Sequence, residues 1–139
     1  MAVYTLDIEE DFDFDIVGIS SHEKPYRLAW SLNKGLGWKL VRKDDLMIRQ
    51  KTGYSEHGQF RYVHPTDNSV ITMIDNKTSG GLFIPELSQF DFIVKIENDR
   101  FGCDDHFLKR LRSCSFVITA FVLQVEKIKS KHNLVFEYR

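Results

Sequence analysis

The chain has 139 residues and a net charge of −1, from 19 basic and 20 acidic side chains. This length suits one domain with its own core, so residues 1–139 are treated as a single domain. The 42% hydrophobic and 13% aromatic shares exclude a disordered chain. No apolar run could span a membrane, no signal peptide is visible, and the strong basic excess of nucleic-acid-binding domains is missing. We therefore expect a cytoplasmic protein with no membrane association.

Two strands are predicted at the N-terminus, over residues 2–8 and 12–19. In the second, apolar side chains alternate with Asp11, Asp13 and Asp15, as in a strand with one buried face. These carboxylates do not form an EF-hand, because Ile16 and His22 occupy the positions where such a loop needs Gly and Glu. They are predicted to face solvent, and no metal site is expected.

A helix is predicted from the segment that follows. Ser20 or Ser21 could cap it, Pro25 suits its first turn, and Gly35 and Gly37 supply its end. At 100° per residue its core stripe comprises Pro25, Leu28, Ala29, Leu32 and Leu36, and the opposite, solvated stripe comprises Arg27, Ser31 and Lys34. A third stripe, beside the core face, comprises Tyr26, Trp30 and Asn33.

The rest of the chain predicts further strands and one short helix. The strands cover residues 39–42, 46–49, 59–64, 70–75, 90–97, 116–125 and 134–138. Residues 51–58 are predicted to form a loop. Asp104 and Asp105 begin the second helix, whose last turn is basic. The nearly continuous apolar run 116–125 predicts a central strand, so that Phe121→Ala should cost about as much stability as Leu32→Ala, about 2–5 kcal/mol.

These elements predict an α+β fold: a single domain with a mostly antiparallel β-sheet and two helices packed on it. Cys103 and Cys114 form no CxxC motif and are predicted to be reduced thiols. The five histidines stand singly, and the chain contains no GxSxG, GxxxxGK[ST] or HExxH motif. We therefore expect no metal or cofactor and assign no catalytic residue from motifs.

One motif stands apart from this general pattern. Residues 84–92 read Ile-Pro-Glu-Leu-Ser-Gln-Phe-Asp-Phe, which resembles the motif of the IPExxxVDY proteins of Bacteroidota. Asp91 matches the motif aspartate, whereas Phe90 and Phe92 stand in place of its valine and tyrosine. The similarity extends to the Tyr26–Trp30 helix and the ending over residues 131–136. It implies a bacterial, cytosolic protein and no particular activity.

Two interpretations of this motif remain open. It could be a rigid turn that fixes the entry to a core strand, because Pro85 restricts Ile84 to an extended conformation. Alternatively, it could line one concave site with the flank of the first helix. The ligand-binding residues of that hypothesis are Arg27, Trp30, Asn33, Glu86 and Asp91.

Three functions are compatible with the sequence. The favoured one is a non-enzymatic binding or adaptor domain that self-associates through an exposed strand edge. An alternative is an RNA- or ribosome-associated factor that uses Trp30, Trp38, Arg42 and Lys43, although two aspartates interrupt this basic cluster. A further alternative is a small enzyme whose acid and base are Glu86 and Asp91.

Overall fold

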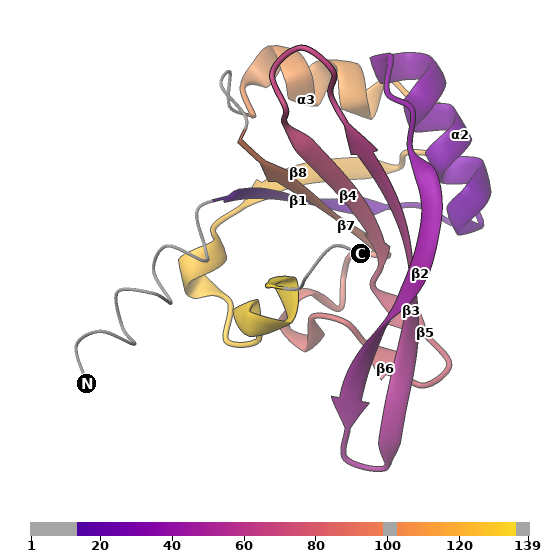
Figure 1. The fold of residues 1–139 in the computed structure, drawn as a ribbon, viewed down its shortest axis with the longest axis vertical. Helices are drawn as coiled ribbons and strands as arrows, with labels where there is room; N and C mark the ends of the chain where they lie inside the picture. Colours follow the sequence, from indigo (N-terminus) through magenta and orange to yellow (C-terminus); the bar gives the residue numbers. More distant parts are fainter. Residues whose placement is uncertain (1–13, 99–102, 136–139) are drawn as a thin grey trace.

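The computed structural model describes residues 14–98 and 103–135. Within these ranges the chain forms a six-stranded antiparallel sheet in the order β2-β3-β4-β7-β1-β8, with two α-helices (Figure 1). The sheet strands are β1 (Phe14–Ser20), β2 (Val41–Gln50), β3 (Gly53–Val63), β4 (Val70–Asp75), β7 (Phe92–Glu97) and β8 (Thr119–Leu123). The helices are α2 (Pro25–Leu36) and α3 (Asp105–Arg112). This confirms the α+β class; the strand predicted over residues 2–8 lies outside the described residues.

Short elements complete the fold. A small two-stranded sheet is formed by β5 (Lys77–Thr78) and β6 (Gly81–Leu82). The described residues also contain three 3-10 helices: η1 (Pro85–Leu87), η2 (Val125–Lys127) and η3 (Lys131–Leu134). None of the helices in the described ranges combines the length and the hydrophobicity needed to cross a membrane. Cys103 and Cys114 are thiols and form no disulfide.

Each face of the six-stranded sheet carries its own hydrophobic core. Successive strand residues point to opposite faces, and in β1 the buried Val17 and Ile16 accordingly belong to different clusters. Val17 packs with Leu28 and Leu32 of α2 and with Leu111 of α3 on what we call the helix face. The opposite face, here the turn face, is covered by residues 83–90, Val125, Ile128 and Leu134. Figure 1 shows the two helices on one side of the sheet and the 3-10 helices on the other.

The first helix forms where the sequence predicts it, with two differences. Four residues of its core stripe, Leu28, Ala29, Leu32 and Leu36, are buried, and Pro25 is half-buried. Gly37, at φ 72°, ends the helix with a left-handed residue. Lys24, rather than a serine, is the N-terminal cap residue, and the Ser21 hydroxyl instead accepts the Glu23 N–H. Ser31, predicted to be solvated, is buried because its hydroxyl donates a hydrogen bond to the Ser115 carbonyl.

The loop predicted over residues 51–58 is wrong. β2 and β3 form a long hairpin that joins at Lys51 and Thr52, and Gly53 begins β3 at φ 142°. Buried side chains alternate along β3, but several of them are polar, namely Ser55, His57 and Gln59. A pattern of alternating apolar residues does not reveal such a strand, because its inward positions hold hydrogen-bonding side chains.

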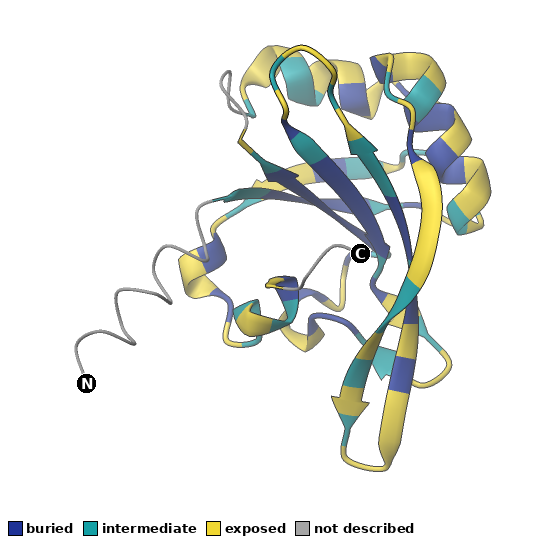
Figure 2. Ribbon diagram, viewed as in Figure 1, coloured by how far each residue is buried: buried dark blue, intermediate teal, exposed yellow. Residues whose placement is uncertain are grey.

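The central position predicted for residues 116–125 is also wrong. The strand here, β8, lies at the edge of the sheet and covers only five residues. Phe121 is 49% exposed, whereas Ala120 is fully buried. Figure 2 shows exposed stretches along β8, in contrast to the mostly buried β4 and β7. The apolar character of the run has another cause: the Phe121 ring packs beside Phe90 and under the Arg112 guanidinium.

Two further predictions fail near the motif and at the C-terminus. The strand predicted over residues 90–97 begins later, at Phe92, and Phe90 lies before it, in the turn-face core. The predicted strand 134–138 is not formed at its start, because Leu134 ends η3 and is buried on the turn face. Residues 136–138 lie outside the described residues.

Candidate functional site

The five residues predicted to line one site do not come together. Trp30 and Asn33 lie on α2, which packs on the helix face. Glu86 lies in η1, whose neighbours Ile84 and Leu87 are buried in the turn-face core. The sheet therefore separates the flank of α2 from the Ile-Pro-Glu turn, and the hypothesis of a shared hollow loses its geometric basis.

Glu86 fixes the turn to a distant part of the chain. Its Oε1 accepts hydrogen bonds from the Ser130 N–H at 2.7 Å and from the Ser130 hydroxyl at 3.0 Å. Asn133 donates a 2.8 Å hydrogen bond to the Phe83 carbonyl nearby. Both contacts tie the residues around η1 to those around η3, so this carboxylate acts as a structural clamp on the turn face.

Asp91 joins β7 to the segment before α2. Its Oδ2 accepts the Ser21 N–H at 2.9 Å, and its Oδ1 lies 3.4 Å from the Lys77 ammonium. Its own N–H donates to the Ile19 carbonyl. These bonds hold the exit of β1 against the entry of β7, which agrees with the interpretation of the motif as a rigid turn.

The residues of the α2 flank have separate environments. Asn33 bonds both the N–H and the carbonyl of Leu40, which fixes the chain just before β2. Arg27 lies 3.7 Å from Glu23 and stacks over the Phe116 ring at 4.9 Å. Trp30 is 56% exposed.

The residues of the RNA alternative are also dispersed. Trp38 is partly buried and stacks on Phe107 of α3. Arg42 forms an ion pair with Asp45 and lies over Phe60. Trp30 stands on α2 and Lys43 on the edge strand β2. No contact in the described ranges joins these four into one aromatic and basic strip.

Asn76, which follows β4, holds the Ile-Pro-Glu turn together through its side chain. The sequence alone did not identify this residue. Its amide nitrogen donates to the carbonyls of Leu87 and Phe90, each at 3.0 Å, and its Oδ1 accepts the Ile84 N–H at 2.7 Å. The side chain is fully buried. One asparagine thus partners three buried backbone groups, although the Leu87 carbonyl also accepts the Phe90 N–H at 2.9 Å.

A second buried polar network joins β2, β3 and β4. His57 Nδ1 lies 2.8 Å from the Asp75 carbonyl, which can only accept, so Nδ1 carries the proton. His57 Nε2 therefore accepts the Ser55 hydroxyl proton over 2.6 Å, and Gln50 donates to the same hydroxyl. Burial lowers the pKa of His57, against the raising effect of the Asp75 carbonyl.

This pair resembles a serine activated by a histidine, but its location does not suit catalysis. Ser55 is 1% exposed and His57 is fully buried against the Phe83 ring. A substrate would have to displace this packing to reach the hydroxyl. The network is the polar interior of β3, and His57 adds a side-chain contact to β4 beyond the ladder that begins at Gln59 and Ile74.

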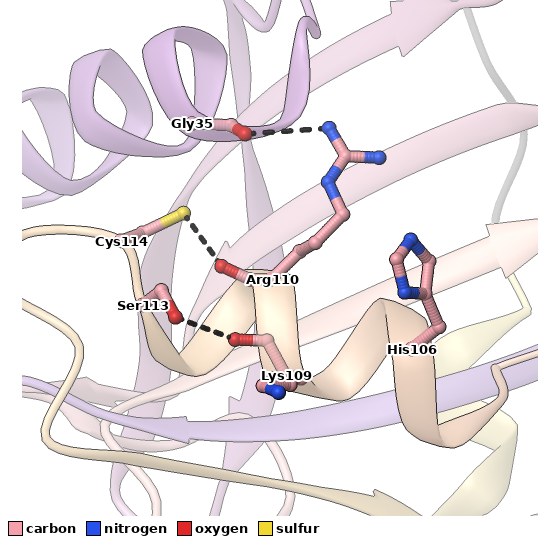
Figure 3. A pocket seen from close by; sticks show the side chains of 6 residues that line it. All are labelled: Gly35, His106, Lys109, Arg110, Ser113 and Cys114. Carbon is pink, nitrogen blue, oxygen red and sulfur yellow. Dashed lines mark hydrogen bonds between the residues drawn. The ribbon is translucent and has the colours of Figure 1, made fainter.

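Two adjoining hollows lie along α3. The first, of about 390 Å³, is lined by Gly35 at the end of α2 and by His106, Lys109, Arg110, Ser113 and Cys114 (Figure 3). We call it the cationic hollow, because Lys109 and Arg110 line it and none of the described carboxylates does. In Figure 3 the Arg110 side chain extends from α3 toward Gly35, and its Nη2 donates to that carbonyl at 3.4 Å.

The second hollow, of about 460 Å³, lies between α3, the residues after α2 and the turn that joins β3 to β4. We call it the aromatic hollow, because Trp38 and Phe107 line it, with ring centroids 6.1 Å apart. Its other lining residues are Leu36, Gly37, His64, Asp67, Ser69, Ile71, Ile96, Asp104, His106 and Arg110. His106 and Arg110 line both hollows, so the two adjoin there.

The thiol in the cationic hollow is a packing residue. Cys114 is buried, its Sγ lies 3.5 Å from the Arg110 carbonyl, and burial raises its pKa. A Cβ placed on Gly35 would lie 2.4 Å from this sulfur, so Gly35 permits the close approach of α2 and the end of α3. A raised thiol pKa disfavours the nucleophilic thiolate.

The sequence shows the residues of these hollows but not their proximity. Trp38, His64 and Arg110 come from three segments that the fold brings together, with no spacing that marks them as a set. Among the described residues, no group of three or more His, Cys, Asp or Glu side chains could hold a metal ion. Comparison of the chain with protein-family models, curated proteins and solved structures gives no match. The resemblance to the IPExxxVDY proteins stays a prediction.

Proposed function

We propose that this protein is a non-enzymatic binding domain whose ligand occupies the two hollows along α3. The observation that carries the proposal is that His106 and Arg110 line both hollows, which makes them two parts of one concave surface. Their volumes, about 390 and 460 Å³, fall within the range of about 300–1,000 Å³ typical of small-molecule sites.

We favour binding over catalysis because the candidate acid and base, Glu86 and Asp91, are both used in structural contacts. Glu86 holds Ser130, and Asp91 holds Ser21 and Lys77. Both carboxylates belong to the turn and line neither hollow. A cytoplasmic location stays part of the proposal, on the sequence features alone.

Self-association through a strand edge is not part of the proposal. At the β2 edge the pairing register shifts between Lys43 and Leu46, and charged side chains occupy this stretch. At the β8 edge, Arg112 donates two hydrogen bonds to the Ala120 carbonyl. Bulges and charged groups of this kind oppose the addition of a further strand.

A screen of small neutral and charged compounds, followed by amide chemical shifts in NMR spectra, tests the proposed function. Compounds that bind should change the chemical shifts of amides in α3 and in residues 36–38. His106→Trp should weaken their binding, because the larger side chain fills the junction of the hollows. His22→Trp is the matched control, since His22 is an exposed histidine outside both hollows. A screen without hits at these amides would refute the proposal.

A further inference from the structure

We propose that the ligand is a small aromatic compound carrying one anionic group, with its ring in the aromatic hollow and its anion in the cationic hollow. This inference rests on the proposed function and adds the chemical class of the ligand. Its basis is that the two hollows adjoin but differ in chemistry, so a molecule that fills both must have two different ends.

The aromatic hollow suits a planar ring. The Trp38 and Phe107 rings are inclined by 30° to each other and present aromatic surface at the hollow. Leu36, Ile71 and Ile96 extend the apolar lining. Aromatic rings stack on such surfaces in offset or tilted geometry and gain about 0.5–1.5 kcal/mol beyond simple burial.

The cationic hollow suits an anion of carboxylate or phosphate type. The bond from Arg110 to the Gly35 carbonyl is long, at 3.4 Å, and uses one of the five N–H donors of the guanidinium. Lys109, the neighbouring residue of α3, also lines the hollow and adds a second positive charge. The Ser113 hydroxyl donates its proton to the Lys109 carbonyl at 2.8 Å, so the anion is held by the two basic residues and not by this hydroxyl. An arginine fork matches the two oxygens of a carboxylate or a phosphate.

Two carboxylates give the ligand its direction. Asp67 and Asp104 line the aromatic hollow and not the cationic one. Asp67 is held by the N–H and hydroxyl of Ser69, and Asp104 caps α3 through the Phe107 N–H at 2.8 Å. Their negative charge disfavours an anion in the aromatic hollow, so the anionic group is directed toward Lys109 and Arg110.

The two tryptophans of the chain allow a selective test. The Trp30→Phe variant removes the exposed tryptophan of α2 and leaves Trp38, which lines the aromatic hollow, as the fluorescent reporter. The probes are two matched pairs, AMP with adenosine and phenylacetate with phenylacetamide, together with inorganic phosphate. The change in Trp38 emission measures the binding of each probe. We expect AMP, phenylacetate or both to bind at least tenfold more tightly than the neutral partner.

Two charge variants in the same background identify the site of the anion. Arg110→Gln should weaken the binding of the anionic probe at least tenfold, whereas Arg49→Gln, on the exposed side of β2, should not change it. Tighter binding of AMP would identify a phosphate, and tighter binding of phenylacetate a carboxylate; either supports the inference. Inorganic phosphate alone should bind more weakly than AMP.

Three results would overturn the inference: neither anionic probe binds, the neutral partners bind equally well, or Arg110→Gln has no effect. These results differ from a failure of the proposed function. If neutral compounds bind at the α3 amides and His106→Trp blocks them, the binding domain stands and only the ligand class is refuted. If no compound shifts these amides, both proposals fail.

Discussion

The Phe90 ring lies directly over Gly18, where a Cβ would stand 2.6 Å from two of the ring carbons. Gly18 is in the middle of β1, between β7 and β8, and Phe90 belongs to the turn-face core. The absent side chain of Gly18 therefore lets the residues after the Ile-Pro-Glu turn lie flat on the sheet. This contact connects the motif to the centre of the fold.

Gly18→Ala should destabilise the protein by about 1–3 kcal/mol, because Phe90 must move out of a packed position. Urea denaturation measures the loss. Gly58→Ala is the matched control in β3, where the nearest atom to a new Cβ is the flexible end of the Arg42 side chain. That variant should stay within about 0.5 kcal/mol of the wild type. Equal stability of the two variants would contradict the packing role of Gly18.

Asn76→Ala should cost about 2–6 kcal/mol, since it leaves the Ile84 N–H and the Phe90 carbonyl without their partner, at about 1–3 kcal/mol for each buried group. The Leu87 carbonyl keeps its hydrogen bond from the Phe90 N–H. Thermal and urea unfolding report the loss, with Gln89→Ala, an exposed position of the same turn, as the control. Comparable stability of the two variants would mean that the turn does not depend on Asn76.

Asp75 gives the protein an unusual pH dependence. Burial raises its pKa from 3.8 to about 6, the largest cause, and the Asp91 charge adds to this. Between these values the folded state binds a proton that the unfolded state releases, so this group's contribution to stability falls as the pH rises from about 4 to about 6. Asp75→Asn should remove this loss and raise the stability at pH 7, because an amide oxygen can still accept the Lys77 N–H.

Urea denaturation between pH 4 and pH 8 tests this prediction, with Asp67→Asn as the control for charge removal. The same series reports on His57, whose lowered pKa has the opposite effect. The contribution of His57 to folding stability is fully present above pH 6.5, the ordinary pKa of histidine, and is lost as the pH falls toward the lowered pKa. In Asp75→Asn the stability should therefore decrease on acidification below 6.5; an unchanged profile would refute both assignments.

The sequence identifies those elements whose inward side chains are uniformly apolar. α2 is recognisable because four aliphatic residues share one stripe, and the hairpin over residues 59–75 because its alternation ends in strong turn residues. β3 extends further than expected because Ser55 and His57 face inward. Hydrogen bonds rather than hydrophobicity place these side chains in the interior.

The candidate site is harder to predict, for a topological reason. Glu86 and Trp30 look equally available in the sequence, yet the sheet stands between them. Trp38 and Phe107 are separated by about half of the chain and stack in the structure. Which face a segment covers depends on its strand register, and periodicity within one segment does not contain that information.

Leu32→Ala and Phe121→Ala should differ, although the sequence predicts similar costs. Leu32 is fully buried between α2 and the sheet, so its truncation should cost about 2–5 kcal/mol. Phe121 is half exposed at the edge, and its truncation should cost about 1 kcal/mol. Lys34→Ala, on the surface of α2, is the reference for a neutral change in the same denaturation series. Equal costs for the first two would restore the central position of β8.

The β8 edge offers the last prediction. Ile19 directs its carbonyl toward β7, where it accepts the Asp91 N–H, so its partner Ala120 directs its own carbonyl away from β1. Arg112 covers this outward carbonyl with two hydrogen bonds, at 2.7 and 2.9 Å, and its guanidinium lies over the Phe121 ring. The Arg112 side chain, which comes from α3, thus occupies the position that a further strand would take.

Arg112→Ala should uncover the Ala120 carbonyl beside the exposed Phe121 and Val122, and an uncovered apolar edge pairs readily with another chain. Size-exclusion chromatography with light scattering should show a monomer for the wild type and a concentration-dependent dimer for the variant. Arg49→Ala removes the same charge from the other edge of the sheet and should remain a monomer. A wild-type dimer would show that the edges pair despite their protection, and a monomeric Arg112→Ala variant would show that Arg112 is not what keeps the β8 edge from pairing.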